Sequence, residues 1–69
     1  MFSTDTRILV ADDMPTIRDL VKAQLKNMGF KTILEAADGE HAMNLLIANN
    51  QAGNPIQLVI SDWNMPKMT

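Results

Sequence analysis

The 69-residue chain contains no cysteine, only three aromatic residues, and apolar runs that are each a few residues long. The lack of cysteine excludes disulfide bonds and thiolate metal sites, and it fits a reducing cytoplasm, where we expect the protein to reside. The short apolar runs and the absence of an amino-terminal signal pattern predict no membrane association and no export. A net charge of -2 provides no basic stripe, which argues against nucleic acid as a partner.

The length allows at most one domain, near the lower size limit for a self-sufficient core. Ordering this many residues costs on the order of 100 kcal/mol, at about 1.5 kcal/mol each. The apolar content of 46% must therefore be buried efficiently, or be supplemented by association with another chain.

Two apolar runs each end in carboxylate residues. Ile8–Ala11 is followed by Asp12 and Asp13, and Leu58–Ser61 is followed by Asp62. Neighbouring parallel strands lie about 4.8 Å apart and finish at the same edge of a sheet, so acids at the ends of adjacent strands converge. Three carboxylates about 6 Å apart, at an effective dielectric constant of about 20, repel by about 3 kcal/mol per pair. Such a cluster needs a proton or a cation, and an oxygen-only site open to water favours Mg²⁺.

The remaining pattern alternates strands and helices. Three consecutive apolar residues indicate a strand covered on both faces, a proline suits a first helical position, and a glycine suits a left-handed helix end. An Asn-, Gly- and Pro-rich stretch predicts a loop before the last strand. In chain order we expect a strand over Arg7–Ala11, a helix from Pro15 to Met28 ended by Gly29, a strand over Lys31–Glu35, a helix capped by Asp38 that ends at about Ala48 or Asn49, and a strand over Ile56–Ser61.

Right-handed crossovers make this β-α-β-α-β alternation a parallel, doubly wound α/β unit. The strand orders 1-2-3 and 2-1-3 are both open, and only the second makes the first and third strands neighbours. The converging acids favour 2-1-3, with one helix on each face of the sheet. The crevice between strands 1 and 3 is then the topological switch point, where open α/β sheets bind ligands. The alternative is an acidic helix start beside an unrelated loop acid.

Three segments together resemble the receiver domain of two-component response regulators, most closely the CheY-like single-domain chemotaxis type. They are Val10–Pro15 with its acidic pair, Ala37–Glu40, and Ser61–Pro66 with its Asp-x-x-Met-Pro sequence. The resemblance covers nearly the whole chain and implies a flavodoxin-like fold. The acidic pair and the Asp-x-x-Met-Pro segment are specific only in combination.

The resemblance implies a role for each acid. Asp62 would accept a phosphoryl group from a phosphohistidine of a chemotaxis-type sensor histidine kinase, so the chain would be a signalling domain and not an enzyme. Mg²⁺, with Mn²⁺ as a possible substitute, would bind to four residues. Asp13 and Asp62 would be ligands, Asp12 would bind through water, and Asn64 would contribute its backbone carbonyl. The full-length protein would act on a flagellar switch or another target.

The sequence also departs from the family pattern. Receivers have five strands and five helices, with a Ser or Thr ending strand 4 and a Lys ending strand 5, whereas three strands are expected here. We therefore expect residues 1–69 to be an amino-terminal fragment of a receiver. Its last strand would lie at an open sheet edge, which favours a homodimer or higher self-association. A self-associating half-domain without a working phosphorylation site is the alternative function.

An aspartate-nucleophile phosphatase is disfavoured because that class requires acids two positions apart, whereas Asp12 and Asp13 are adjacent. Among the other residues, His41 is expected to be a solvated helix residue, and Trp63 an aromatic packed on its loop. Met28 and Met43 fall on apolar helix faces and are expected in the core.

Overall fold

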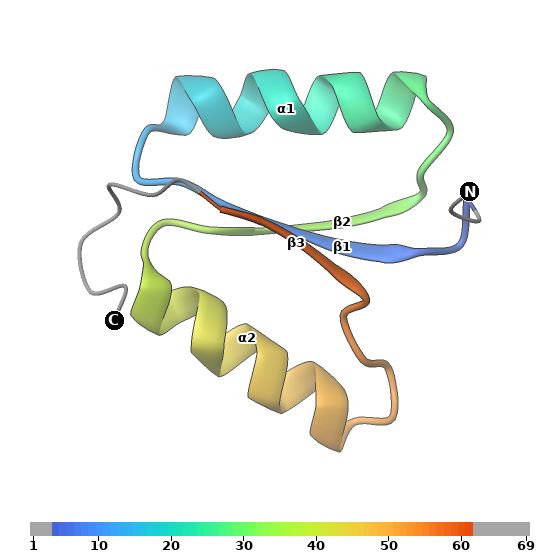
Figure 1. The fold of residues 1–69 in the computed structure, drawn as a ribbon, viewed down its shortest axis with the longest axis vertical. Coiled ribbons are helices and arrows are strands. Elements are labelled where there is room, and N and C mark those ends of the chain that lie inside the picture. The colour runs from blue at the N-terminus through green and yellow to red at the C-terminus, as the bar shows by residue number, and fades with distance from the viewer. Residues whose placement is uncertain (1–3, 62–69) are drawn as a thin grey trace.

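Three parallel strands lie between two helices in the computed structural model, which describes residues 4–61 (Figure 1). Helix α1 covers one face of the sheet, and helix α2 covers the other. The elements in chain order are β1 (Arg7–Ala11), α1 (Pro15–Asn27), β2 (Thr32–Ala36), α2 (Gly39–Gln51) and β3 (Leu58–Ser61). Neither helix is long and apolar enough to cross a membrane within this part of the chain.

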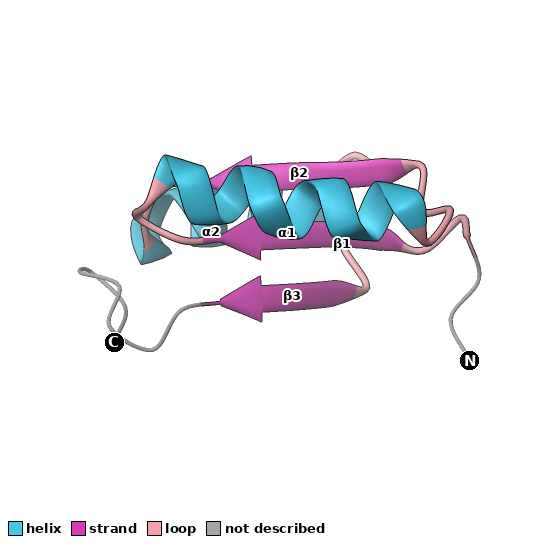
Figure 2. Ribbon diagram, turned by 90° about the horizontal axis from the view of Figure 1, so that it is seen from above, coloured by secondary structure: helices cyan, strands magenta, loops and turns pink. Residues whose placement is uncertain are grey.

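The sheet has the order β2-β1-β3, so the order predicted from the acids is confirmed (Figure 2). Strand β1 pairs with β2 from Arg7 opposite Thr32 to Ala11 opposite Ala36. On its other side β1 pairs with β3, and Ala11 lies opposite Ser61. Both pairings are parallel, so the carboxyl ends of all three strands meet at one edge.

Strand β1 forms the centre of the core because both of its faces are covered. Residues from Ile8 to Ala11 are each at most 2% exposed. Alternate side chains of a strand point to opposite faces, so they fall into two clusters. The cluster on the α2 side contains Leu9, Ala11, Ala36 and Ala42, and the cluster on the α1 side contains Ile8, Val10 and Leu25.

The predicted helix ends are confirmed at three residues. Pro15 is in the first turn of α1, where its missing N–H is not needed. Gly29 has a φ of +100°, and a Cβ built there would lie 3.2 Å from Thr4 Cγ2, so the turn into β2 needs glycine. Asp38 caps α2, since its Oδ1 accepts a hydrogen bond of 2.8 Å from the backbone N–H of His41.

The prediction that Met28 and Met43 belong to the core is wrong. Their exposed fractions are 67% and 56%. Met28 is the residue that follows the last turn of α1, and Met43 lies within α2. Leu25 is the only buried residue of α1. In a three-layer unit a single stripe of each helix reaches the sheet, and the apolar residues outside that stripe stay in contact with solvent.

Five element boundaries also differ from the expected ones. Helix α1 ends at Asn27 and not at Met28, and strand β2 ends at Ala36 and not at Glu35. Strand β2 begins at Thr32 and not at Lys31, whose N–H instead donates to the carbonyl of Thr4. Helix α2 continues to Gln51, and the side chain of Asn49 donates to the carbonyl of Leu45, one turn earlier. Strand β3 is correspondingly shorter at its start and covers Leu58–Ser61.

Candidate functional site

The candidate site lies at the carboxyl edge of the sheet. Asp12 and Asp13 directly follow Ala11, the last residue of β1, and Ala11 lies opposite Ser61, the last residue of β3. The two strand ends that were expected to meet are therefore neighbours. Asp62 and Asn64, the other two predicted site residues, lie outside the described residues.

Asp12 is held in place through three of its polar groups. Its N–H donates to the carbonyl of Ala36 at 3.1 Å, and its Oδ1 accepts from the N–H of Met14 at 2.8 Å. Its carbonyl accepts from Arg18 Nη1 at 2.7 Å. Asp12 is 9% exposed, so it is buried at the carboxyl edge of the sheet, and its hydrogen bonds fix the orientation of the carboxylate. This fixation suits a side chain that contributes charge to a site.

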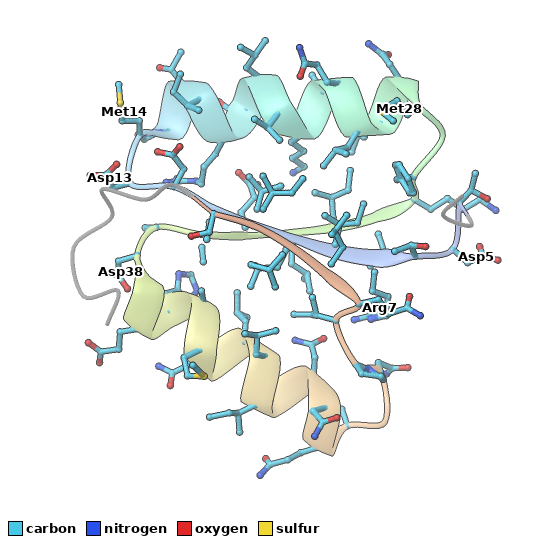
Figure 3. All side chains as sticks on the ribbon, in the orientation of Figure 1. Asp5, Arg7, Asp13, Met14, Met28 and Asp38 are labelled. Atoms are coloured by element: carbon cyan, nitrogen blue, oxygen red, sulfur yellow. The ribbon has the colours of Figure 1, made fainter. Side chains whose placement is uncertain are left out.

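Asp13, by contrast, is exposed to solvent. Figure 3 shows it on the loop that leads from β1 into α1, at the same end of the sheet as Asp38. Arg7 and Asp5 lie at the opposite end. One buried and one exposed carboxylate thus follow each other at the edge where β1 and β3 finish.

Sequence reasoning missed a charged residue of β2, Glu35, which pairs with two basic residues of α1. Glu35 accepts a hydrogen bond of 3.0 Å from Lys22 Nζ, and its other oxygen lies 3.6 Å from Arg18 Nε. The hydrogen bond from Lys22, with the nearby charge of Arg18, lowers the pKa of Glu35 below its ordinary value. A carboxylate inside an otherwise apolar strand, with two basic residues four positions apart on the preceding helix, was the available signal.

The carboxylates present are suited to a hard divalent cation. Within residues 4–61 there is no group of three His, Cys, Asp or Glu side chains placed to hold a metal ion. Asp12 and Asp13 nevertheless supply an oxygen-only pair, and Mg²⁺ is often bound by one or two carboxylates together with water and phosphate oxygens. The donor chemistry therefore fits Mg²⁺.

Comparison with known proteins settles which family this sheet edge belongs to. Residues 8–69 match the response regulator receiver domain. The chain belongs to this receiver family. The resemblance inferred from the two acid-tipped strands and the Asp-x-x-Met-Pro segment is thereby confirmed, together with the flavodoxin-like order of the strands.

Three relatives carry chemotaxis names. The chemotaxis protein CheY of Pseudomonas aeruginosa is 38% identical over 63 residues, which are 91% of this chain and 47% of that protein. The probable chemotaxis protein CheY of Rhizobium etli is 44% identical over 62 residues, covering 90% of this chain and 44% of the relative. The CheY homolog of Campylobacter jejuni is 39% identical over 62 residues, covering 90% and 45%. The chain thus spans about half the length of the relatives that it matches.

Another polar residue near this edge, His41, has a structural role. His41 is exposed, as expected, in the first turn of α2. Its N–H donates to the cap Asp38, and its Nδ1 accepts a long hydrogen bond of 3.4 Å from the N–H of Ala37. Both contacts tie the helix start to the loop after β2, so His41 needs no role in the chemistry of the edge.

Proposed function

We propose that this receiver is a cytoplasmic phosphoacceptor of two-component chemotaxis signalling, phosphorylated on Asp62 by a sensor histidine kinase in the presence of Mg²⁺. The observation that carries the proposal is the strand order β2-β1-β3, which brings the end of β3 beside Asp12 and Asp13. Asp62 is the next residue after β3 in the sequence. Family membership and the chemotaxis names of the relatives support the same assignment.

Receiver domains generally bind Mg²⁺, and the acids of this chain fit that ion. Asp13, which is exposed, would hold the ion directly, and the buried Asp12 would hold it through water. Asp62 and the carbonyl of Asn64 would complete the protein ligands. When bound, the ion offsets the repulsion between carboxylates and phosphate and aligns the transferring oxygens.

The transfer itself uses the Asp62 carboxylate as a nucleophile. One carboxylate oxygen attacks the phosphorus of a phosphohistidine, an O–P bond forms, and the P–N bond breaks with its electron pair returning to the histidine nitrogen. The product is an acyl phosphate, which water later hydrolyses. The chain would then be a switch with a limited lifetime and not an enzyme acting on a separate substrate. A flagellar switch or another target would read the state of the whole protein.

Titration with Mg²⁺ tests the metal site. The single tryptophan, Trp63, follows Asp62 in sequence, so we expect its fluorescence to change with Mg²⁺. Asp13→Asn should weaken this response by about tenfold or more. Asp19→Asn is the matched control, because it removes the same charge from an exposed position on α1 and should leave the response unchanged. A response that survives Asp13→Asn would contradict the assignment.

Phosphorylation is tested with a small phosphodonor such as acetyl phosphate, followed by intact-mass measurement. We expect addition of one phosphoryl group that needs Mg²⁺ and is lost in Asp62→Asn. An adduct that persists in Asp62→Asn would show that the acceptor is another residue.

A second candidate function, self-association, is favoured by the exposure of β3. Strand β3 pairs with β1 on one side only, and within residues 4–61 no strand covers its other side. Val59 at its centre is 40% exposed. Unpaired backbone groups on an apolar edge strand are a template for another chain. Analytical ultracentrifugation tests this, and a folded monomer at all concentrations would exclude a homodimer.

A further inference from the structure

The side chain of Arg18 connects helix α1 with two strands of the sheet. Its Nη1 donates to the carbonyl of Asp12 at 2.7 Å, and its Nε lies 3.6 Å from a carboxylate oxygen of Glu35 on β2. The side chain is only 18% exposed. The guanidinium therefore sits between Asp12, the residue after β1, and Glu35, the second-last residue of β2.

Arginine is suited to this bridging position for a physical reason. Its planar guanidinium carries donors in a fixed fork and keeps its charge at any pH that a protein experiences. Nε is buried and, among the described residues, has no hydrogen-bond partner, so the nearby Glu35 carboxylate is what offsets its charge. With Glu35 anchoring one side of the plane, the direction of Nη1 is set.

The carbonyl oxygen of Asp12, which accepts from Arg18, influences the backbone orientation at Asp13. The carbonyl of Asp12 and the N–H of Asp13 belong to the same planar peptide unit. A hydrogen bond to this carbonyl therefore restrains the plane of the peptide unit that precedes the Cα of Asp13. The N–H and the Oδ1 of Asp12 are fixed separately, by Ala36 and by Met14. Among the hydrogen bonds seen within residues 4–61, the one from Arg18 thus acts on the peptide unit that links the two acids.

We propose that Arg18, anchored by Glu35, is a positioning residue that sets the relative placement of the Asp12 and Asp13 carboxylates. The effect of Arg18 on metal binding rests on the function proposed above. Its effect on the conformation of the loop between β1 and α1 is independent of that function. Partners that orient metal ligands typically change metal affinity by about tenfold or more when removed.

The test compares Arg18→Ala with Lys22→Ala. Both variants remove one positive charge from α1 and one partner of Glu35, but only the first releases the carbonyl of Asp12. The readout is hydrogen exchange of the Met14 N–H in metal-free protein, because this group donates to Asp12 Oδ1. We expect exchange about fivefold faster in Arg18→Ala, and a change below about twofold in Lys22→Ala.

Mg²⁺ affinity is measured on the same variants. We expect it to fall by about tenfold in Arg18→Ala and to stay within about twofold in Lys22→Ala. If Arg18→Ala does not fold, Arg18→Lys carries the test, since it keeps the charge but reaches the Asp12 carbonyl or Glu35 with one donor group. It should show an intermediate exchange rate at Met14.

The outcomes separate this inference from the proposed function. Unchanged exchange at Met14 in the Arg18 variant that folds, or equal acceleration in Lys22→Ala, would overturn the positioning role even if Mg²⁺ binds normally. Faster exchange at Met14 in a protein that shows no response to Mg²⁺ would confirm the positioning role. It would at the same time reject the metal site.

Discussion

The two ends of β1 both carry charged residues, but they use them differently. At the amino end, Arg7 Nε donates to the carbonyl of Asn54 at 3.0 Å, and Nη2 donates to Asn49 Oδ1 at 2.8 Å. Its backbone N–H donates to Gln57 Oε1, and its carbonyl accepts from the Gln57 N–H. Arg7 thereby joins the start of β1 to the end of α2 and to the loop before β3.

At the carboxyl end the restraints act on backbone groups and on one oxygen of Asp12, and Asp13 remains exposed. The charge of Arg7 is directed at other parts of the chain, whereas at the other end Asp12 is buried and the Asp13 carboxylate faces solvent. The comparison indicates that the amino end stabilises the fold and that the carboxyl end is available for binding. Substitutions at the two ends should therefore affect different measurements.

The largest loss of stability is expected from Arg7→Met. Methionine keeps the aliphatic part of the side chain but removes the contacts to Asn49 and Asn54. Hydrogen bonds from a charged donor contribute about 1.5 kcal/mol or more each, and partial exposure reduces this, so we expect a loss of about 2 kcal/mol in the free energy of unfolding. Urea denaturation measures it. Mg²⁺ affinity of the folded protein should not change, and a large change would break the division between the two ends.

A smaller loss is expected from Asp38→Ala at the carboxyl side of β2. The substitution leaves the N–H of His41 without its acceptor at the start of α2 and should cost about 1 kcal/mol. Asp38→Ser retains a capping oxygen and should stay close to the unaltered protein in thermal denaturation. Equal losses in both variants would mean that charge, and not the cap, is what Asp38 contributes.

The pH dependence of stability should show a contribution from Glu35. Its pKa is lowered in the folded protein by Lys22 and Arg18, so the contribution is fully present above the unfolded-state pKa of about 4.5 and is lost as pH falls through the lower folded-state value. We expect about 0.5 kcal/mol, as is usual for a partly exposed ion pair. Glu35→Gln should remove this part of the acid dependence, measured by urea denaturation between about pH 6 and 3. If the loss of stability at low pH is the same in Glu35→Gln as in the unaltered protein, the pairing of Glu35 with Lys22 and Arg18 does not contribute to stability.

The smallest effect on stability is expected at Asp13. Asp13→Asn changes an exposed side chain, so the free energy of unfolding without metal should shift by less than about 0.5 kcal/mol. The same variant should weaken Mg²⁺ binding by about tenfold or more. A loss of stability comparable to that of Arg7→Met would show that the acidic end is also structural and would remove the contrast between the ends.

Local signals in the sequence predicted the frame of the fold. Pro15, Gly29 and Asp38 act within one helical turn, and each has the predicted role. The strand order followed from the acids at the ends of β1 and β3. The receiver family was identified from these acids together with the Ala37–Glu40 segment and the Asp-x-x-Met-Pro sequence, and the family match confirms it.

The exposed positions of Met28 and Met43 could not be predicted, because spacing along a helix does not reveal how much of its apolar face the sheet covers. Contacts between distant residues were missed for a similar reason. Arg7 and Asn49 are far apart in the sequence, and the pairing of Arg18 with Asp12 depends on the path of the loop between them. Of the predicted site, Asp12 and Asp13 lie at the expected edge of the sheet, and the metal-binding and phosphoacceptor roles of Asp12, Asp13, Asp62 and Asn64 all stay predictions.

The central place of β1 also has a consequence for the order in which the chain folds. Ile8 pairs with Ile33 on one side and with Leu58 on the other, so its second partner is synthesised much later than its first. Closing the longer loop costs more entropy, which favours early pairing of β1 with β2 and late docking of β3. Until β3 docks, one edge of the most apolar strand is open. Chaperone binding or aggregation during synthesis would act at that stage.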